Sequence, residues 1–286
     1  MIADRETNFL YLAGSLPVKY PDFFARLENS LNDIGLNWAL LPKTKDVWAV
    51  DYMPVQVNIN TFVDFIYQPS YLTRYKKYAN TITDADAVCS EVGINTVKAD
   101  IILDGGNVTR CKNSVIVTDR IFKDNPCYER KKLIKTLYEF LEVEKLYLIP
   151  EQPGDFTGHS DGMIRFVDEN TVVINDYARE NQRFQSAFDI AIHNTGLDYV
   201  KLAYNPYDNK SNDQANGDYI NFLQMENTLV VPTFGIREDD IAIRCLETIY
   251  PQQKIVTIES NEVANDGGVL NCISWNIKIS PDSSTP

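Results

Sequence analysis

The chain has 286 residues, of which 44% are hydrophobic and 23% are charged, as in ordinary folded proteins. Its formal net charge of -13 comes from 40 acidic against 27 basic side chains, which argues against the basic face that nucleic-acid binding requires. No apolar run approaches the ~18 residues that span a bilayer, and the N-terminus lacks a secretory signal, so we expect a cytoplasmic protein without a membrane partner.

Short strands rich in valine and isoleucine alternate with helices whose apolar residues recur at three- and four-residue spacing. In chain order, the predicted elements are a strand at 9–12, a helix at 21–34 and a strand at 37–41; strands at 101–104 and 114–117, a helix at 128–142 and a strand at 145–149; strands at 163–167 and 171–175, a helix at 182–193 and a strand at 199–202; strands at 219–223 and 228–232, a helix at 239–249 and a strand at 254–258; and a last strand at 269–279. A further set is predicted between residues 48 and 97, with 62–79 less regular.

These elements repeat as strand-strand-helix-strand at a spacing of roughly fifty residues. We therefore predict an α/β fold, a five-bladed propeller of ββαβ modules with pseudo-five-fold symmetry. The fifth module is split between the two termini, which would close the ring and leave no free edge strand. One domain is expected over residues 1–286, with a disordered tail at 281–286. An open α/β sheet is the structural alternative.

Four segments carry residues with chemical potential, and each lies on or beside the first strand of a module. They are Trp48–Asp51, Asp104–Asn107, Gly158–Asp161 and Asp266–Ser274, the last containing Cys272 on the final predicted strand. First strands of a ring meet around its axis, so these segments are predicted to converge on one pocket.

The residue types in this predicted pocket suit a guanidinium substrate. A guanidinium is planar and always charged, and carboxylates bind its fork of donors by charge-assisted hydrogen bonds, which makes Asp51 and Asp161 the candidate receptors. Its central carbon is a poor electrophile, so a thiolate from Cys272 is the sensible nucleophile. The charge of the substrate would itself help to form that thiolate.

His159 is the candidate general acid and base, since the leaving nitrogen needs a proton and the attacking water must lose one. Asp104 would orient the imidazole and raise its pKa, and Gly105 and Gly106 would let the backbone approach the ligand. No metal or organic cofactor is required. The five cysteines form no CxxC pair, and the chain has only two histidines, which argues against a zinc or disulfide framework.

Taken together, these motifs resemble the guanidino-group-modifying superfamily, and more specifically its agmatine deiminase and bacterial peptidylarginine deiminase branch. The match in order and spacing runs from Trp48 to Cys272. The resemblance implies a five-bladed α/β propeller in which Cys272 is the nucleophile, Asp104 and His159 form the acid-base couple, and Asp51 and Asp161 bind guanidinium. Trp48 and Asn107, which stand in the same motifs, complete the predicted substrate-binding set.

The chain departs from that family pattern at three positions. It has Val50 where the family commonly has arginine, Asp104 where many members have glutamate, and Asn271 where agmatine-type enzymes often have histidine. These departures concern the substrate more than the reaction class.

We predict a cysteine-dependent hydrolase that converts a small cationic guanidino compound, agmatine-like or arginine-like, into a ureido product and ammonia. Two alternatives use the same cysteine adduct, an amidinotransferase and a dimethylarginine-type hydrolase. A third is a non-catalytic guanidino-binding propeller. Arg165, Arg179 and Arg237 are expected at the surface or in salt bridges rather than at the substrate tail. Oligomeric state stays open, with a homodimer as one candidate.

Overall fold

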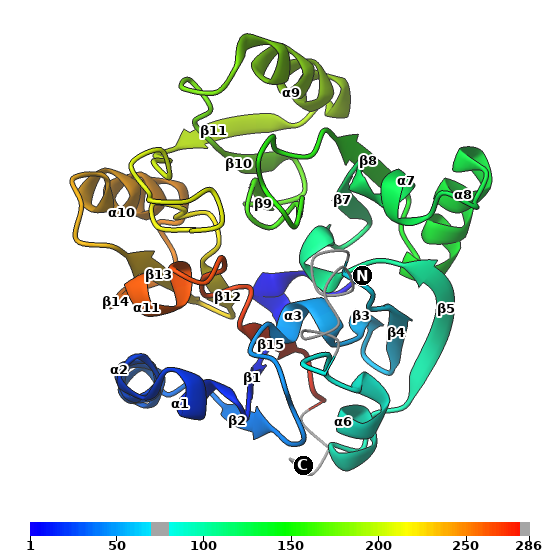
Figure 1. The fold of residues 1–286 in the computed structure, drawn as a ribbon, viewed down its shortest axis with the longest axis horizontal. Helices are drawn as coiled ribbons and strands as arrows, with labels where there is room; N and C mark the ends of the chain where they lie inside the picture. Colours follow the sequence, from blue (N-terminus) through cyan, green and yellow to red (C-terminus); the bar gives the residue numbers. More distant parts are fainter. Residues whose placement is uncertain (70–79, 281–286) are drawn as a thin grey trace.

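The computed structural model describes residues 1–69 and 80–280 and has a mixed α/β fold. Its strands form five separate three-stranded sheets within these two stretches. Figure 1 shows the five sheets arranged around a common centre, with the longer helices toward the outside. No sheet made by the described residues closes on itself, and none of their helices is long and apolar enough to cross a membrane.

Each sheet follows one pattern, in which the central strand pairs antiparallel with one neighbour and parallel with the other. In spatial order, the sheets are β3 (Val55–Asn58), β4 (Thr61–Ile66) and β5 (Thr96–Ile102); β6 (Thr109–Cys111), β7 (Ser114–Thr118) and β8 (Lys145–Ile149); β9 (Ile164–Phe166), β10 (Thr171–Asn175) and β11 (Asp198–Leu202); β12 (Leu223–Met225), β13 (Thr228–Thr233) and β14 (Lys254–Glu259); and β15 (Ser274–Ile277), β1 (Phe9–Ala13) and β2 (Trp38–Leu41).

A helix precedes the third strand of every sheet. These helices are α2 (Pro21–Ile34), α6 (Ala85–Glu91), α8 (Arg130–Leu141), α9 (Gln182–Thr195) and α10 (Glu238–Ile249). Shorter helical turns are η1 (Asp4–Glu6), α1 (Leu16–Lys19), α3 (Ala49–Tyr52), η2 (Gly105–Asn107), α7 (Arg120–Asp124) and α11 (Asn261–Ala264). The strand-strand-helix-strand order predicted from the sequence therefore recurs along the chain. Part of the irregular stretch 62–79 lies outside the described residues.

Helix α9 illustrates why these segments fold as they do. The side chain of Asn181 caps its first turn by accepting a hydrogen bond from the backbone N of Phe184 at 2.9 Å. Phe184, Phe188 and Ile192 follow at four-residue spacing and are buried on one face. The helix ends at Gly196, whose φ of +70° is the left-handed conformation that glycine adopts without strain.

The two ends of the chain share one sheet. Strand β15 pairs antiparallel with β1, with Tyr11 opposite Trp275, and β1 pairs parallel with β2. This confirms the predicted pairing of the terminal strands. The expectation that no edge strand remains free is wrong, because each of the five sheets is open and keeps two edges.

Three strand predictions are wrong in a way that matters for the site. Residues 101–104 do not open a module, since Ile101 lies at the end of β5, the third strand of the preceding sheet. In 219–223 only Leu223 belongs to a strand, and in 269–279 the strand is confined to Ser274–Ile277. The apolar residues at 219–222 and 269–273 are buried outside strands, and burial alone does not distinguish a turn from a strand.

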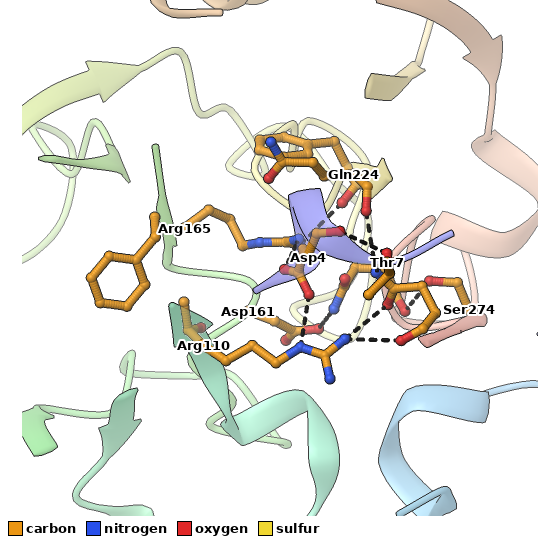
Figure 2. A network of polar contacts seen from close by, with 12 residues as sticks. Asp4, Thr7, Arg110, Asp161, Arg165, Gln224 and Ser274 are labelled. Atoms are coloured by element: carbon orange, nitrogen blue, oxygen red, sulfur yellow. Dashed lines mark hydrogen bonds and ion pairs between the residues drawn. The ribbon is translucent and has the colours of Figure 1, made fainter. Parts of the chain in front are cut away.

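The N-terminal segment joins four of the innermost strands. Asp4 of η1 accepts hydrogen bonds from Arg110 of β6 at 2.9 Å and from Arg165 of β9 at 2.6 Å. Arg110 also donates to the backbone O of Asn276 in β15, and Arg165 to that of Phe222, just before β12. Figure 2 shows this cluster close to Asp161. The predicted salt-bridge role of Arg165 is confirmed by its ion pair with Asp4. Through these contacts the N-terminal segment links sheets that share no strand.

Candidate active site

A cavity of about 390 Å³ lies where the turns before β3, β9, β12 and β15 meet. Its lining includes five of the residues predicted from the sequence: Trp48, Asp51, His159, Asp161 and Cys272. None of them lies on a first strand. Each lies in the turn or short helix directly before a first strand. The prediction that Cys272 lies on the last strand is therefore wrong, because β15 begins at Ser274 and Cys272 lies in the turn before it.

His159 lies between two carboxylates. Its Nε2 is 3.1 Å from Asp104 Oδ2, and its Nδ1 is 3.4 Å from Asp51 Oδ1. Burial opposes protonation of this ring, but the charge of Asp51 and the hydrogen bond and charge of Asp104 outweigh burial and raise the pKa of His159 to about 10. The imidazole is therefore protonated at neutral pH and able to act as a proton donor.

Asp104 stands behind the imidazole rather than in the cavity wall. It precedes η2, and its Oδ2 meets His159 while its Oδ1 is buried without a hydrogen-bond partner among the described residues. Asp104 thus contacts the imidazole from outside the cavity lining.

Gly106 passes between the charged groups so closely that no side chain fits there. Its backbone N donates to Asp51 Oδ1 at 3.1 Å. A Cβ at this position would lie 2.5 Å from that oxygen and 2.7 Å from His159 Nδ1, where real Cβ atoms are essentially never found. The glycine is needed for close approach, not for an unusual φ.

Asp161 is held by hydrogen bonds from several directions. Its backbone N donates to the O of Gly106 at 3.1 Å. Its Oδ2 accepts from the side-chain amides of Asn271 at 2.7 Å and Asn221 at 3.1 Å. Burial raises the pKa of the Asp161 carboxyl above its ordinary value, and the charge of His159, followed by these hydrogen bonds and the charge of Arg165, opposes that rise.

The thiol of Cys272 lies 3.8 Å from Asp161 Oδ2. Burial, followed by the charges of Asp161 and Asp51, raises the pKa of Cys272 well above the ordinary range of a thiol. In the unliganded protein the sulfur is therefore protonated. A cation bound between the two carboxylates would offset their charges and lower the pKa of Cys272.

Trp48 forms a wall of the cavity beside the turn that carries Cys272. A Cβ on Gly268 would lie 2.5 Å from Cζ3 of Trp48 and 3.0 Å from Cβ of Cys272, so only glycine lets the indole pack against this turn. On the outer side, the ammonium of Lys19 lies 5.8 Å from the centre of the indole ring.

The structure does not bring Asn107 to the cavity. Its side chain is buried, and its Oδ1 accepts a hydrogen bond from the backbone N of Thr118 at 2.9 Å. The contact ties the η2 turn to β7 and so supports the position of Gly106.

Two residues of the cavity wall were not identified from the sequence. Asn221 directly precedes β12, the position that corresponds in its sheet to those of Asp51, Asp161 and Cys272. The repeat pattern could have pointed to it, but the strand predicted at 219–223 hid it. Asp218 lies nearby, and burial and then the charge of Asp161 raise the pKa of its carboxyl well above the ordinary value.

The outer part of the cavity is acidic. Its acidic lining residues, besides Asp51, Asp161 and Asp218, are Asp155, Glu180, Asp213 and Asp266. Arg179 is the one lysine or arginine among the described lining residues, and its guanidinium lies 4.4 Å from the ring centre of Tyr207. Within the described parts of the chain, no cluster of three or more histidine, cysteine or acidic side chains is arranged to hold a metal ion.

Comparison with known proteins gives curated relatives that match about two thirds of this chain. A protein from Mycoplasma capricolum subsp. capricolum, named "Putative agmatine deiminase", is 24% identical over 222 residues, which are 66% of this chain and 61% of that relative. The match thus spans about three fifths of the length of this curated relative.

Solved structures share the fold. The C. jejuni agmatine deiminase gives a TM-score of 0.76 at 19% identity, over 98% of this chain and 96% of that one. The agmatine deiminase of Enterococcus faecalis also gives 0.76, at 18% identity, over 98% and 95%. The family model described as Porphyromonas-type peptidyl-arginine deiminase matches residues 24–277, and this chain belongs to that family.

Proposed function

We propose that this protein is a cysteine-dependent hydrolase that converts a guanidino compound into a ureido compound and ammonia. The observation that carries the proposal is the grouping in one cavity of the Cys272 thiol, the carboxylates of Asp51 and Asp161, and a protonated His159. Membership of the deiminase family and the names of the relatives support the same reaction class.

Binding of the substrate sets the charges for the reaction. Asp51 and Asp161 hold the guanidinium by charge-assisted hydrogen bonds, with its plane against the wall that includes Trp48. The bound cation offsets the two carboxylate charges that hold the pKa of Cys272 high, so the thiol releases its proton to solvent water and the thiolate forms beside the central carbon.

The chemistry then proceeds in two halves. The Cys272 thiolate forms a C–S bond to the guanidinium carbon, and a C–N bond breaks as His159 gives its proton to the departing nitrogen, which leaves as ammonia. The product of this half is a thiouronium adduct. Neutral His159 next takes a proton from water, whose oxygen attacks the same carbon, and breakage of the C–S bond releases the ureido product and restores the thiolate.

Asp104 keeps the imidazole in position through both halves and favours its protonated form. Asn107 supports the η2 turn rather than touching substrate. The high pKa of His159 suits its first task, because the ring carries the proton over the whole neutral range.

The acidic cavity favours a substrate whose other end is cationic or neutral. A carboxylate tail such as that of free arginine would face Asp155, Glu180 and Asp213, and Arg179 already stacks on Tyr207. An agmatine-like substrate carries an ammonium there and meets attraction instead. We therefore place agmatine-like compounds ahead of arginine.

The five sheets are proposed to be the blades of one α/β propeller, and residues 1–286 one domain. Support comes from the recurring strand order, the shared terminal sheet and the arrangement around a common centre (Figure 1). A single cooperative unfolding transition by calorimetry is expected, whereas two separate transitions would contradict one domain.

Product analysis tests the function. Wild-type protein incubated with agmatine, arginine, methylated arginines and an arginine peptide is expected to form ureido product and ammonia, with agmatine the best substrate. Cys272→Ser should abolish turnover, because an alcohol is a far weaker nucleophile toward this carbon. Cys245→Ser, a partly exposed cysteine outside the cavity, is the matched control and should keep full activity.

Two results would contradict the proposal. Turnover by folded Cys272→Ser would remove the nucleophile from the mechanism. Inactive wild type across the whole panel would favour the binding-protein alternative. Release of an alkylamine instead of ammonia, or transfer of the amidino group to an added amine, would identify the dimethylarginine-type or amidinotransferase reaction.

A further inference from the structure

Asn221 joins the turn that carries Cys272 to the carboxylate of Asp161. Its side chain is 2% exposed and lies in the wall of the cavity, just before β12. Its two polar atoms point to two different parts of the site, which come from different sheets. Among the described residues that line the cavity, Asn221 is the one whose side chain hydrogen-bonds both to the carboxylate of Asp161 and to the backbone of the turn that carries Cys272.

The amide nitrogen of Asn221 acts on Asp161. It donates to Oδ2 at 3.1 Å, beside the 2.7 Å hydrogen bond from Asn271 to the same oxygen. Oδ1 lies on the other side, 3.4 Å from the point where a Cβ of Gly106 would be. The two amides thus fix the rotation of the carboxylate and occupy one oxygen, so that the other is left to face a cation.

The amide oxygen of Asn221 acts on the backbone of the nucleophile. It accepts from the N of Cys272 at 3.2 Å and from the N of Asn271 at 3.1 Å. The N of Asn271 also reaches the backbone O of Asn221 at 3.0 Å. These contacts hold the turn that sets the direction of the thiol, because backbone position decides where Sγ points.

We propose that Asn221 is a positioning residue that holds the nucleophile and the guanidinium-binding carboxylate in one fixed frame. The proposal rests on the proposed function for its catalytic meaning. The structural part of the proposal is narrower. It states only that the position of the Cys272 thiol relative to a cation bound at Asp161 depends on the buried amide of Asn221. Placement within a fraction of an ångström matters for such an attack, since small displacements of reacting groups reduce rates steeply.

Two variants separate the two ends of this amide. Asn221→Ala removes both contacts. Asn221→Asp keeps an oxygen for the backbone amides but replaces the donor to Asp161 with a second acid. A carboxyl pair shares one proton at low pH and repels at high pH, so Asn221→Asp should approach wild-type behaviour as the pH falls. Asn221→Ala should show no such recovery.

The measurement is the rate of alkylation of Cys272 by 2-chloroacetamidine divided by its rate with 2-chloroacetamide. The first reagent is a cation and the second a neutral analogue with the same leaving group, so the ratio reports how well the thiol and the carboxylate act together. Asn221→Ala is expected to lower this ratio and the kcat/KM for agmatine by about tenfold or more, the effect of one or two lost buried hydrogen bonds.

Asn8→Ala is the matched control for loss of fold stability. Asn8 makes two hydrogen bonds to the backbone of Ile279, and neither residue lines the cavity, so this variant should lose stability and keep the ratio. A wild-type ratio in folded Asn221→Ala, or a pH response of Asn221→Asp identical to that of Asn221→Ala, would overturn the proposal.

The ratio needs no turnover. If wild type fails to hydrolyse any guanidino compound while Asn221→Ala still lowers the ratio, the proposed function fails and the positioning role stands. If wild type hydrolyses a guanidino compound and Asn221→Ala leaves the alkylation ratio unchanged, the proposed function stands and the positioning role fails. Should Asn221→Ala not fold, the pH response of Asn221→Asp decides the question.

Discussion

At the scale of single residues, Cys272 is surrounded by carboxylates rather than by the cations that usually activate a cysteine. Burial and the charges of Asp161 and Asp51 keep its thiol protonated, while His159 holds a proton between Asp51 and Asp104. A bound cation would offset the charges of these carboxylates and lower the pKa of Cys272. Reactivity of the sulfur should depend on occupancy of the carboxylates.

Removing one of those charges should have opposite effects on two readouts. Asp161→Asn takes away a negative charge beside Cys272, which lowers the thiol pKa and raises the thiolate fraction at a fixed neutral pH. Alkylation of Cys272 by neutral iodoacetamide should quicken, by about tenfold for each unit of pKa, while agmatine turnover falls because guanidinium loses a receptor. The measurement is the alkylation rate across the neutral-to-alkaline range.

Asp176→Asn is the control for this pair of readouts, since Asp176 is exposed and pairs with Lys201 outside the cavity. Slower or unchanged alkylation in Asp161→Asn would mean that Asp161 does not control the thiol.

Residues with distinctive chemistry were the ones that could be recognised from the sequence. A thiol, an imidazole and acids beside glycines stand out, and the structure groups Cys272, His159, Asp51 and Asp161 in one cavity. Asn221 did not stand out, because a neutral amide inside an apolar run has no such signature. Its role depends on which backbone atoms lie opposite it.

At the scale of elements, the site is built from the turns that precede the first strands. The η2 turn is the most constrained of these, since the backbone of Gly106 fills the space between Asp51 and His159. Asp104 at the start of the same turn reaches the far side of the imidazole. One short element therefore sets the spacing of Asp104, His159 and Asp51.

Gly106→Ala should show this constraint. The added methyl would push Asp51 or His159 away, and a displacement near 1 Å can cost about a hundredfold in rate. We expect kcat/KM for agmatine to fall by about that factor. Gly35→Ala is the control: Gly35 has φ of +73° and open space around it, so the change should cost stability and not activity. Near wild-type activity in folded Gly106→Ala would contradict the role given to η2.

The helices could be predicted from the sequence more closely than the first strands. Helix α9 was predicted at 182–193 and spans Gln182–Thr195, because a long apolar stripe with a cap gives a strong signal. Strands β12 and β15 are only three and four residues long. The buried turns before them are just as apolar, so the sequence pattern extended both strands too far toward the N-terminus.

At the scale of the whole molecule, both ends of the chain hold the centre together. The first and last described strands pair in one sheet, and Asp4 connects Arg110 and Arg165 of two further sheets. The pairing of the terminal strands could be predicted because the elements of the fifth module are divided between the two ends of the sequence. The Asp4 contacts could not, since an isolated acid near the N-terminus carries no sign of its partners. A homodimer stays a prediction.

The central claim is that Cys272 forms a covalent adduct with the guanidinium carbon. Rapid quenching of wild-type protein with agmatine, followed by mass spectrometry of its peptides, tests this directly. The account predicts that the peptide containing Cys272, and no other cysteine peptide, gains the mass of agmatine less ammonia. The adduct should be absent in Cys272→Ser. Formation of ureido product with no adduct at any time, or an adduct on another cysteine, would contradict the account.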